Sequence, residues 1–124
     1  MNRSKENDMP IAKKYLFIVS MDVQKDKEAL FNEVYDKEHV PLLGKVPGVG
    51  AITRMRTEPA AFNIGGERKT LDGAGMATYV AMYELDSPDV LLSKEWAAAG
   101  EQGRWPKEVR PFTFNRSHVV RKII

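Results

Sequence analysis

The sequence contains no cysteine among its 124 residues. Disulfide bonds, thiolate nucleophiles and cysteine-ligated metal sites are therefore excluded, and the absence is consistent with a reducing compartment. Long apolar runs are lacking too, since none approaches the roughly 18 residues that a membrane-spanning helix requires. The start, "MNRSKENDMPIAKK", is charged and polar, and no signal-peptide h-region with a cleavage site follows it. We therefore expect a cytoplasmic protein that does not enter a membrane.

An excess of charge of either sign is also missing. The 19 basic and 17 acidic residues leave a formal net charge of +2, and the densest basic cluster, "RKII" at the end, is too short for a nucleic-acid footprint. The composition is typical of a soluble globular protein, and the length fits one domain. We expect a single domain over residues 13–124 behind a flexible N-terminal arm of residues 1–12, with no nucleic-acid partner.

Apolar periodicity divides the domain into strands and helices. Strands are predicted from runs rich in aromatic and β-branched residues or with half-buried alternation, and helices from apolar residues at helical spacing. In chain order the expected elements are a strand at 15–21, a helix at 25–39, strands at 48–57 and 77–85, a helix at 86–102 and a long strand at 110–124. This β-α-β-β-α-β order predicts a ferredoxin-like α+β fold, a four-stranded antiparallel sheet with two helices on one face.

Local signals define the ends of these elements. Pro41 disfavours helical geometry in the residue before it, so the first helix is expected to end or kink just beyond His39. Ser87 is a candidate N-cap of the second helix, with Pro88 at its first position. Residues 58–76 are rich in glycine and have no sustained period, which predicts a long loop.

Two strands are apolar on both faces, namely those at 15–21 and 77–85. The helices can cover only one face of the sheet, so the second face needs another cover. An identical sheet is the simplest cover, and we therefore expect a homodimer formed through the open sheet face.

The stretch "FNEVYDKEHVPLLGKVPGV" (31–49) combines an aromatic and acidic helix ending in Glu-His-x-Pro with a short Leu-rich link to Pro-Gly. In this pattern the chain resembles the dimeric α+β barrel superfamily, most closely its EthD-like branch, over about residues 13–122. The resemblance implies a sheet-to-sheet homodimeric barrel. Superfamily members include muconolactone-type isomerases, cofactor-free monooxygenases of aromatic polyketides, polyketide cyclases and haem proteins, so the reaction stays open. The long 58–76 segment departs from the shorter members.

His39 lies on the border of the apolar sector of the first helix, four residues after Tyr35 and on the same flank. Two interpretations remain open. The imidazole either finishes the helix end through local hydrogen bonds, where the dipole favours it, or lines a cleft, as the resemblance implies. In the second case it would move a proton on a small carbonyl-containing or phenolic substrate.

Two carboxylates precede this histidine. Glu38 falls inside the apolar sector, so it extends its carboxylate out to solvent, pairs with an arginine, with Arg54 and Arg56 as candidates, or is a desolvated acid with a raised pKa. Asp36 lies beyond that sector, where it is either solvated or orients His39.

Aromatic residues and a second histidine are further candidates for substrate contact. Tyr35, Tyr79 and Tyr83 can supply phenol donors to a ligand or simply pack in the core. Trp105 can close the mouth of a cleft or the dimer edge, and His118 of the last strand can contact a ligand or an interface. No H-x-H or H-E-x-x-H spacing is present, so we expect neither a metal nor another cofactor.

Together these features favour a small cofactor-independent enzyme, isomerase-like or cyclase-like or else monooxygenase-like. His39 would act as acid and base, with Glu38 or Asp36 orienting it and Tyr35 holding the substrate. The expected substrate is a small, largely apolar oxygenated compound such as an aromatic, a lactone or a polyketide-derived molecule. The alternative is a non-catalytic ligand-binding or assembly module of the same fold, and the third possibility is a haem-binding member.

Overall fold

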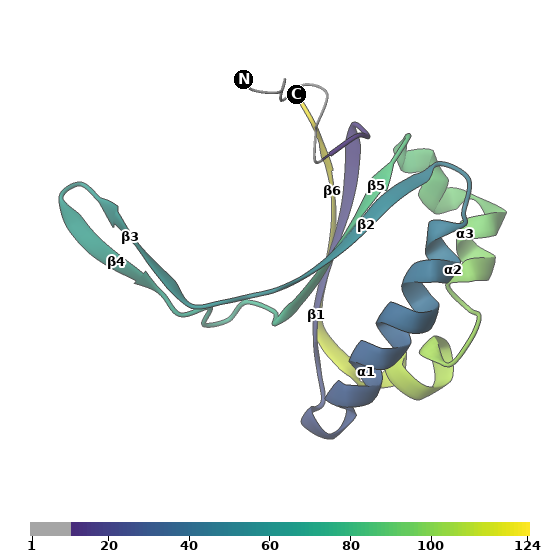
Figure 1. Cartoon of the computed structure of the whole chain (residues 1–124), viewed down its shortest axis with the longest axis horizontal. Helices are drawn as coiled ribbons and strands as arrows, with labels where there is room; N and C mark the ends of the chain where they lie inside the picture. The colour runs from purple at the N-terminus through teal and green to yellow at the C-terminus, as the bar shows by residue number, and fades with distance from the viewer. Residues whose placement is uncertain (1–10) are drawn as a thin grey trace, which may run out of the picture.

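Four strands form one antiparallel sheet in the computed structural model, which describes residues 11–124. The strands are β1 (Tyr15–Val23), β2 (Val49–Arg56), β5 (Tyr79–Leu85) and β6 (Thr113–Lys122), arranged in the order β2-β5-β1-β6. The helices lie on one face of this sheet (Figure 1), so the predicted ferredoxin-like architecture is confirmed. Most of the predicted flexible arm, residues 1–10, lies outside the described residues.

A single helical segment links β1 to β2. It comprises η2 (Lys25–Lys27), α1 (Glu28–Val34), the π-helical turn η3 (Tyr35–His39) and α2 (Val40–Gly44). The helical segment therefore continues past His39. Of the two predicted outcomes, an end or a kink just beyond His39, the end does not occur. In the π-helical turn the Val40 amide donates to the Tyr35 carbonyl, and this wider turn accommodates Pro41, which has no amide hydrogen to donate.

The second helical connection is broken into two short pieces, η4 (Pro88–Leu92) and α3 (Lys94–Ala99). Ser87 caps the first piece, since its Oγ accepts a hydrogen bond from the Asp89 amide at 3.0 Å, and Pro88 follows it as predicted. Ser93 caps the second piece in the same way. After α3, the turns η5 (Trp105–Val109) and η6 (Arg110–Phe112) lead into β6, which therefore begins later than predicted.

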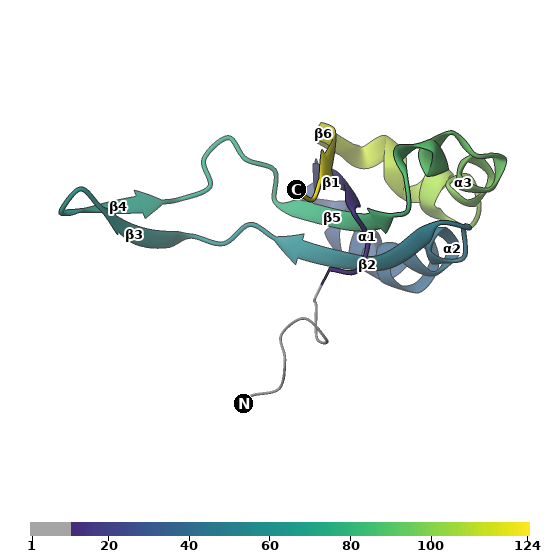
Figure 2. The same ribbon diagram turned by 90° about the horizontal axis from the view of Figure 1, so that it is seen from above.

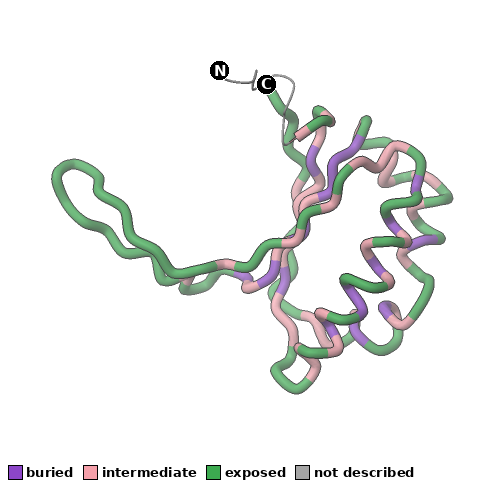
Figure 3. Tube along the Cα trace, in the orientation of Figure 1, coloured by how far each residue is buried: buried purple, intermediate pink, exposed green. Residues whose placement is uncertain are grey.

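Residues 58–76 do not form the predicted irregular loop. They contain a hairpin, β3 (Ala60–Ile64) paired with β4 (Glu67–Leu71). Gly65 and Gly66 connect the strands with φ values of 58° and 79°, and two successive positive φ angles are typical of a type I′ turn. The hairpin projects from the sheet on the side away from the helices (Figures 1 and 2) and is exposed along its length (Figure 3).

The core lies between the sheet and the helices. Phe31, Val34 and Leu43 of the helical segment are buried against the inward residues of the sheet, among them Met21, Ala81, Tyr83 and Leu85. The opposite face of the sheet is also largely apolar, with Ile18, Val80, Met82 and Val119 only half-buried. Within residues 11–124, no helix is long and apolar enough to cross a membrane.

Candidate functional site

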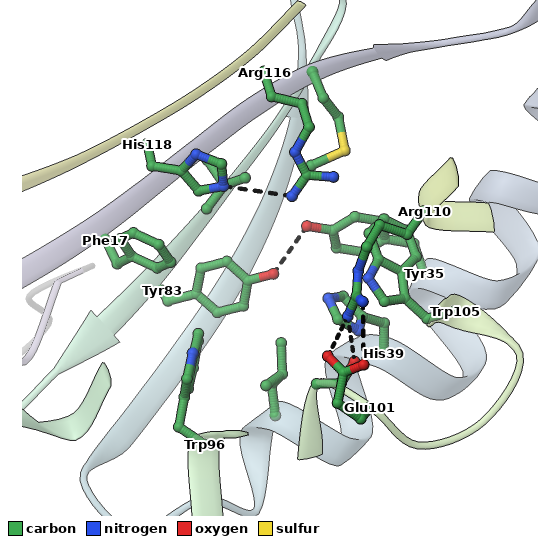
Figure 4. A pocket seen from close by; sticks show the side chains of 14 residues that line it. Phe17, Tyr35, His39, Tyr83, Trp96, Glu101, Trp105, Arg110, Arg116 and His118 are labelled. Atoms are coloured by element: carbon green, nitrogen blue, oxygen red, sulfur yellow. Dashed lines mark hydrogen bonds and ion pairs between the residues drawn. The ribbon is translucent and has the colours of Figure 1, made fainter. Parts of the chain in front are cut away.

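A cavity of about 280 Å³ lies between the sheet and the helical layer. Its walls come from β1, β5 and β6 of the sheet and from η3, α2, α3, η5 and η6 of the helical layer (Figure 4). Five of the residues predicted to form the site line it, namely Tyr35, His39, Tyr83, Trp105 and His118. Segments distant in sequence therefore bring most of the predicted residues to one place.

His39 is 7% exposed and stacks on Trp105, with ring centroids 4.3 Å apart and planes inclined by 20°. The Tyr35 ring meets the imidazole edge-on at 5.0 Å. The Nδ1 atom of His39 is buried and has no hydrogen-bond partner among residues 11–124. Burial, reinforced by the nearby guanidinium groups of Arg110 and Arg116, lowers the pKa of His39 to about 4. The imidazole is therefore neutral at pH 7.

Tyr35 and Tyr83 share a hydrogen bond between their hydroxyl oxygens, 2.9 Å apart, and each ring is 2% exposed. Burial raises the pKa of both phenols, so both are protonated at neutral pH. Since one hydroxyl donates to the other, the second keeps a hydrogen that can be donated into the cavity.

Two arginines carry positive charge to the cavity wall (Figure 4). Arg110 is held by Glu101, with Nη1–Oε1 and Nη2–Oε2 distances of 3.1 and 2.5 Å. Hydrogen bonds from Arg110 lower the pKa of Glu101, which is therefore ionised. Arg116 forms no ion pair with a carboxylate of residues 11–124; it donates to the Thr113 hydroxyl at 2.9 Å.

His118 lies beside Arg116 on β6, with Nε2 3.4 Å from the guanidinium Nη2. The ring stacks on Phe17 of β1 at 5.9 Å. Partial burial and the adjacent Arg116 lower the pKa of His118, so this imidazole is also neutral at pH 7.

Glu38 pairs with an arginine, but with neither of the two predicted ones. Its Oε1 accepts from the Arg104 amide at 2.8 Å and its Oε2 from Arg104 Nε at 2.6 Å. The backbone hydrogen bond and then the side-chain bond lower the pKa of Glu38, so the interpretation as a desolvated acid with a raised pKa is wrong. The predicted partners, Arg54 and Arg56, lie on β2, whereas the observed partner, Arg104, directly precedes Trp105.

Asp36 is exposed and pairs with Arg54 at 2.8 Å. Neither Asp36 nor Glu38 forms a hydrogen bond or ion pair with His39, so the predicted orientation of the imidazole by one of them is not seen. Their partners lie on β2 and in the segment before η5, and each carboxylate is directed there instead.

Tyr79 lies apart from the His39 cavity. Its hydroxyl donates to the Glu28 carboxylate and accepts from Asn32 Nδ2 at 3.3 Å. Together with Arg54 it lines a separate, shallower hollow beside β2. Of the three tyrosines predicted to contact substrate, this one is therefore not in the same site as the other two.

Sequence reasoning missed several lining residues. Arg116 is two residues from His118, and strand alternation places both on the same face, so that signal was present. Glu101 and Arg110 are joined by a segment without regular period, and no pattern in the sequence indicates their pairing. Trp96 of α3 also lines the cavity.

The haem-binding alternative requires a roomy pocket. A cavity of about 280 Å³ is smaller than the roughly 300–1,000 Å³ of typical small-molecule sites. The residues present therefore do not fit a haem. In the part of the chain that the structure describes, no cluster of three or more histidine, aspartate or glutamate side chains is placed to hold a metal ion.

No protein-family model and no curated protein sequence matches this chain. Two solved structures share its fold. An ethyl tert-butyl ether D (EthD) family protein from Bacillus halodurans is 18% identical over 89% of this chain and 99% of its own, with a TM-score of 0.54. A variant of SnoaB, a cofactor-independent oxygenase from Streptomyces nogalater, is 15% identical over 90% of this chain and 93% of its own, with a TM-score of 0.56. The chain thus has the same ferredoxin-like α+β fold as these two proteins.

Proposed function

We propose that the cavity is the active site of a cofactor-independent enzyme in which His39 moves a proton on a small, largely apolar oxygenated substrate. The observation that carries the proposal is a buried, neutral imidazole in the wall of an aromatic-lined cavity, whose enclosed Nδ1 has no hydrogen-bond partner among residues 11–124. A buried polar atom without a partner is costly in a purely structural role, and strongly shifted pKa values cluster at functional sites.

A neutral imidazole can accept a proton, and because Nδ1 is enclosed, Nε2 is the nitrogen left to reach a substrate. The free hydroxyl hydrogen of the Tyr35–Tyr83 pair is suited to stabilise the oxyanion that forms when a phenol or a carbon next to a carbonyl loses a proton. The resulting phenolate or enolate can take up the proton elsewhere, attack an internal carbonyl, or react with dioxygen. These routes are isomerisation, cyclisation and oxygenation respectively, and the cofactor-independent oxygenase SnoaB has the same fold.

Glu38 contributes indirectly in this proposal. Its two bonds to Arg104 fix the residue that precedes Trp105, and Trp105 packs flat on the His39 ring. Glu38 is therefore a positioning residue. Asp36, which pairs with Arg54 in solvent, has no role in this chemistry.

A conversion assay tests this function. Wild-type protein, His39→Gln and the control Lys37→Ala, whose side chain is exposed two residues before His39, are incubated in air with a panel of phenols, lactones and polycyclic aromatic ketones. Mass spectrometry distinguishes gain of oxygen, loss of water and isomerisation at constant mass. We expect wild type and Lys37→Ala to convert a common compound, and His39→Gln to be slower by about 10²-fold or more.

Equal conversion by wild type and His39→Gln would remove the histidine from the chemistry. Binding of panel compounds without conversion by any of the three proteins would favour the non-catalytic ligand-binding module instead.

We also propose that two copies of the chain pair through the open sheet face. That face carries the half-buried apolar side chains of Ile18, Val80, Met82 and Val119. The hairpin β3–β4 projects on the same side and exposes Phe62 and Ile64, although an isolated hairpin is marginal in water. A second copy on the sheet would cover both at once. Sedimentation equilibrium at micromolar concentration tests this, and a single species of 14.0 kDa would contradict it.

A further inference from the structure

We propose, on the basis of the active site proposed above, that the cavity binds an aromatic carboxylate, with the carboxylate group on Arg116 and the ring between the aromatic walls. The starting observation is the unbalanced charge of the cavity. Its lining contains two guanidinium groups, those of Arg110 and Arg116, but only one carboxylate, that of Glu101.

The two arginines differ in their partners. Arg110 has a carboxylate partner, since both of its terminal nitrogens bond Glu101. Among residues 11–124, Arg116 has only the neutral hydroxyl of Thr113 at 2.9 Å and a long contact of 3.4 Å to the His118 ring. Its guanidinium points into the cavity toward the Tyr35–Tyr83 hydroxyl pair (Figure 4). This leaves donors free for an incoming group.

Neighbouring side chains do not cancel the charge of Arg116. Glu101 is offset by Arg110, and His39 and His118 are neutral at pH 7. Arg116 is itself exposed, and a site lined with one uncompensated positive charge favours an anionic ligand. Phenols, with a pKa near 10, are neutral at pH 7, whereas carboxylic acids are ionised. A carboxylate also matches the fork of a guanidinium.

The remaining walls suit a planar ring. Phe17 and Trp96 meet edge to face at 5.9 Å on one side, and Trp105 with its stacked His39 lies on another. Aromatic walls favour flat apolar ligands, and a cavity of about 280 Å³ limits them to one or two fused rings. The ligand class is therefore a one-ring or two-ring aromatic acid whose further oxygen substituent is acted on by His39.

Calorimetric titration with a matched pair of probes tests the inference. The probes are 2-naphthoate and its neutral analogue 2-naphthamide, at pH 7.5 and low salt. We expect wild type to bind the carboxylate about tenfold to a hundredfold more tightly than the amide, because a hydrogen bond to a charged group is worth more than a neutral one. Arg116→Gln should reduce this ratio to near one and leave the Kd of the amide within about twofold. Arg116→Lys, which keeps the charge without the fork, should retain a reduced preference.

The matched control is Arg121→Gln, an exposed arginine on the opposite face of the same strand, which should leave both affinities unchanged. Equal affinities in wild type, a preference that survives Arg116→Gln, or no binding of either probe would each overturn the inference. Equal affinities combined with conversion that depends on His39 would refute the anion site and leave the proposed function intact. A carboxylate preference combined with equal conversion by wild type and His39→Gln would support the anion site and refute the proposed function.

Discussion

His39 has a neutral ring because of where it is buried. The imidazole is stacked on Trp105 and faces the fields of Arg110 and Arg116, so protonation inside the fold is unfavourable. In an unfolded chain the same group titrates near 6.5. The unfolded state therefore binds more protons between the two pKa values, and this difference makes folding stability depend on pH.

The expected result is a loss of stability on acidification. The contribution of His39 is fully present above pH 6.5 and is lost as the pH falls toward 4, where the difference in pKa corresponds to about 3 kcal/mol. Urea unfolding from pH 8 to pH 4 measures this. Because carboxylates also titrate in this range, the comparison is with His39→Gln, whose curve should fall less steeply between pH 6.5 and 4. Parallel curves for the two proteins would contradict the depressed pKa.

The Tyr35–Tyr83 pair gives a second prediction for individual residues. Removing one hydroxyl leaves the other buried without its partner, so Tyr35→Phe and Tyr83→Phe should each lower the free energy of unfolding by about 1 to 3 kcal/mol. The double variant should cost less than the sum of the two, because no unpaired hydroxyl remains. A double-mutant cycle by denaturant unfolding measures the coupling. Additive single effects would show that the two hydroxyls do not interact.

Among the structural elements, the π-helical turn and the segment before η5 together define the cavity wall. The turn carries Tyr35 and His39 at its two ends, and Glu38 within it binds Arg104. Gly103 makes this approach possible, because its φ is +71° and a Cβ added there would lie 2.6 Å from Glu38 Oε1. The conformation and the contact both require glycine.

Gly103→Ala should therefore destabilise the fold by about 2 kcal/mol or more, combining backbone strain with displacement of Glu38. The control is Gly75→Ala, where φ is +77° but nothing lies within 4 Å of the added atom, so only the backbone cost applies. Thermal unfolding followed by near-ultraviolet circular dichroism measures both stability and the environment of Trp105. Equal losses in the two variants would mean that the Glu38–Arg104 contact does not hold this wall.

The sequence indicated the elements that are buried on one side and missed those that are not. Apolar spacing identified the sheet strands and the helix that carries Tyr35 and His39, because burial imposes a period on them. The hairpin β3–β4 is exposed on both faces, so no such period marks it, and only Gly65–Gly66 signalled its turn. The bonds Glu38–Arg104 and Glu101–Arg110 depend on how η5 packs, which no local pattern encodes.

For the molecule as a whole, the open sheet face is the feature that the single chain leaves unexplained. If two copies pair through it, a charge placed on that face must be buried in the interface. Met82→Glu should therefore raise the dimer dissociation constant by about a hundredfold or more, whereas Leu92→Glu, 86% exposed on the helical side, should leave it unchanged. Sedimentation velocity over a dilution series measures both. Unchanged association of Met82→Glu would place any interface elsewhere.

The central claim is that His39 is a neutral acid–base group enclosed in a cavity, and a titration of its ring tests this most directly. Nitrogen-15 NMR of histidine-labelled protein reports the protonation state of each ring, and His39→Gln assigns the signal. The chain has 2 histidines, so the spectrum is simple. The predicted result is a His39 ring that stays neutral from pH 8 to about pH 5 and titrates with a pKa of about 4. A midpoint at or above 6.5 would contradict the claim, because it would place the imidazole in solvent or beside an anion.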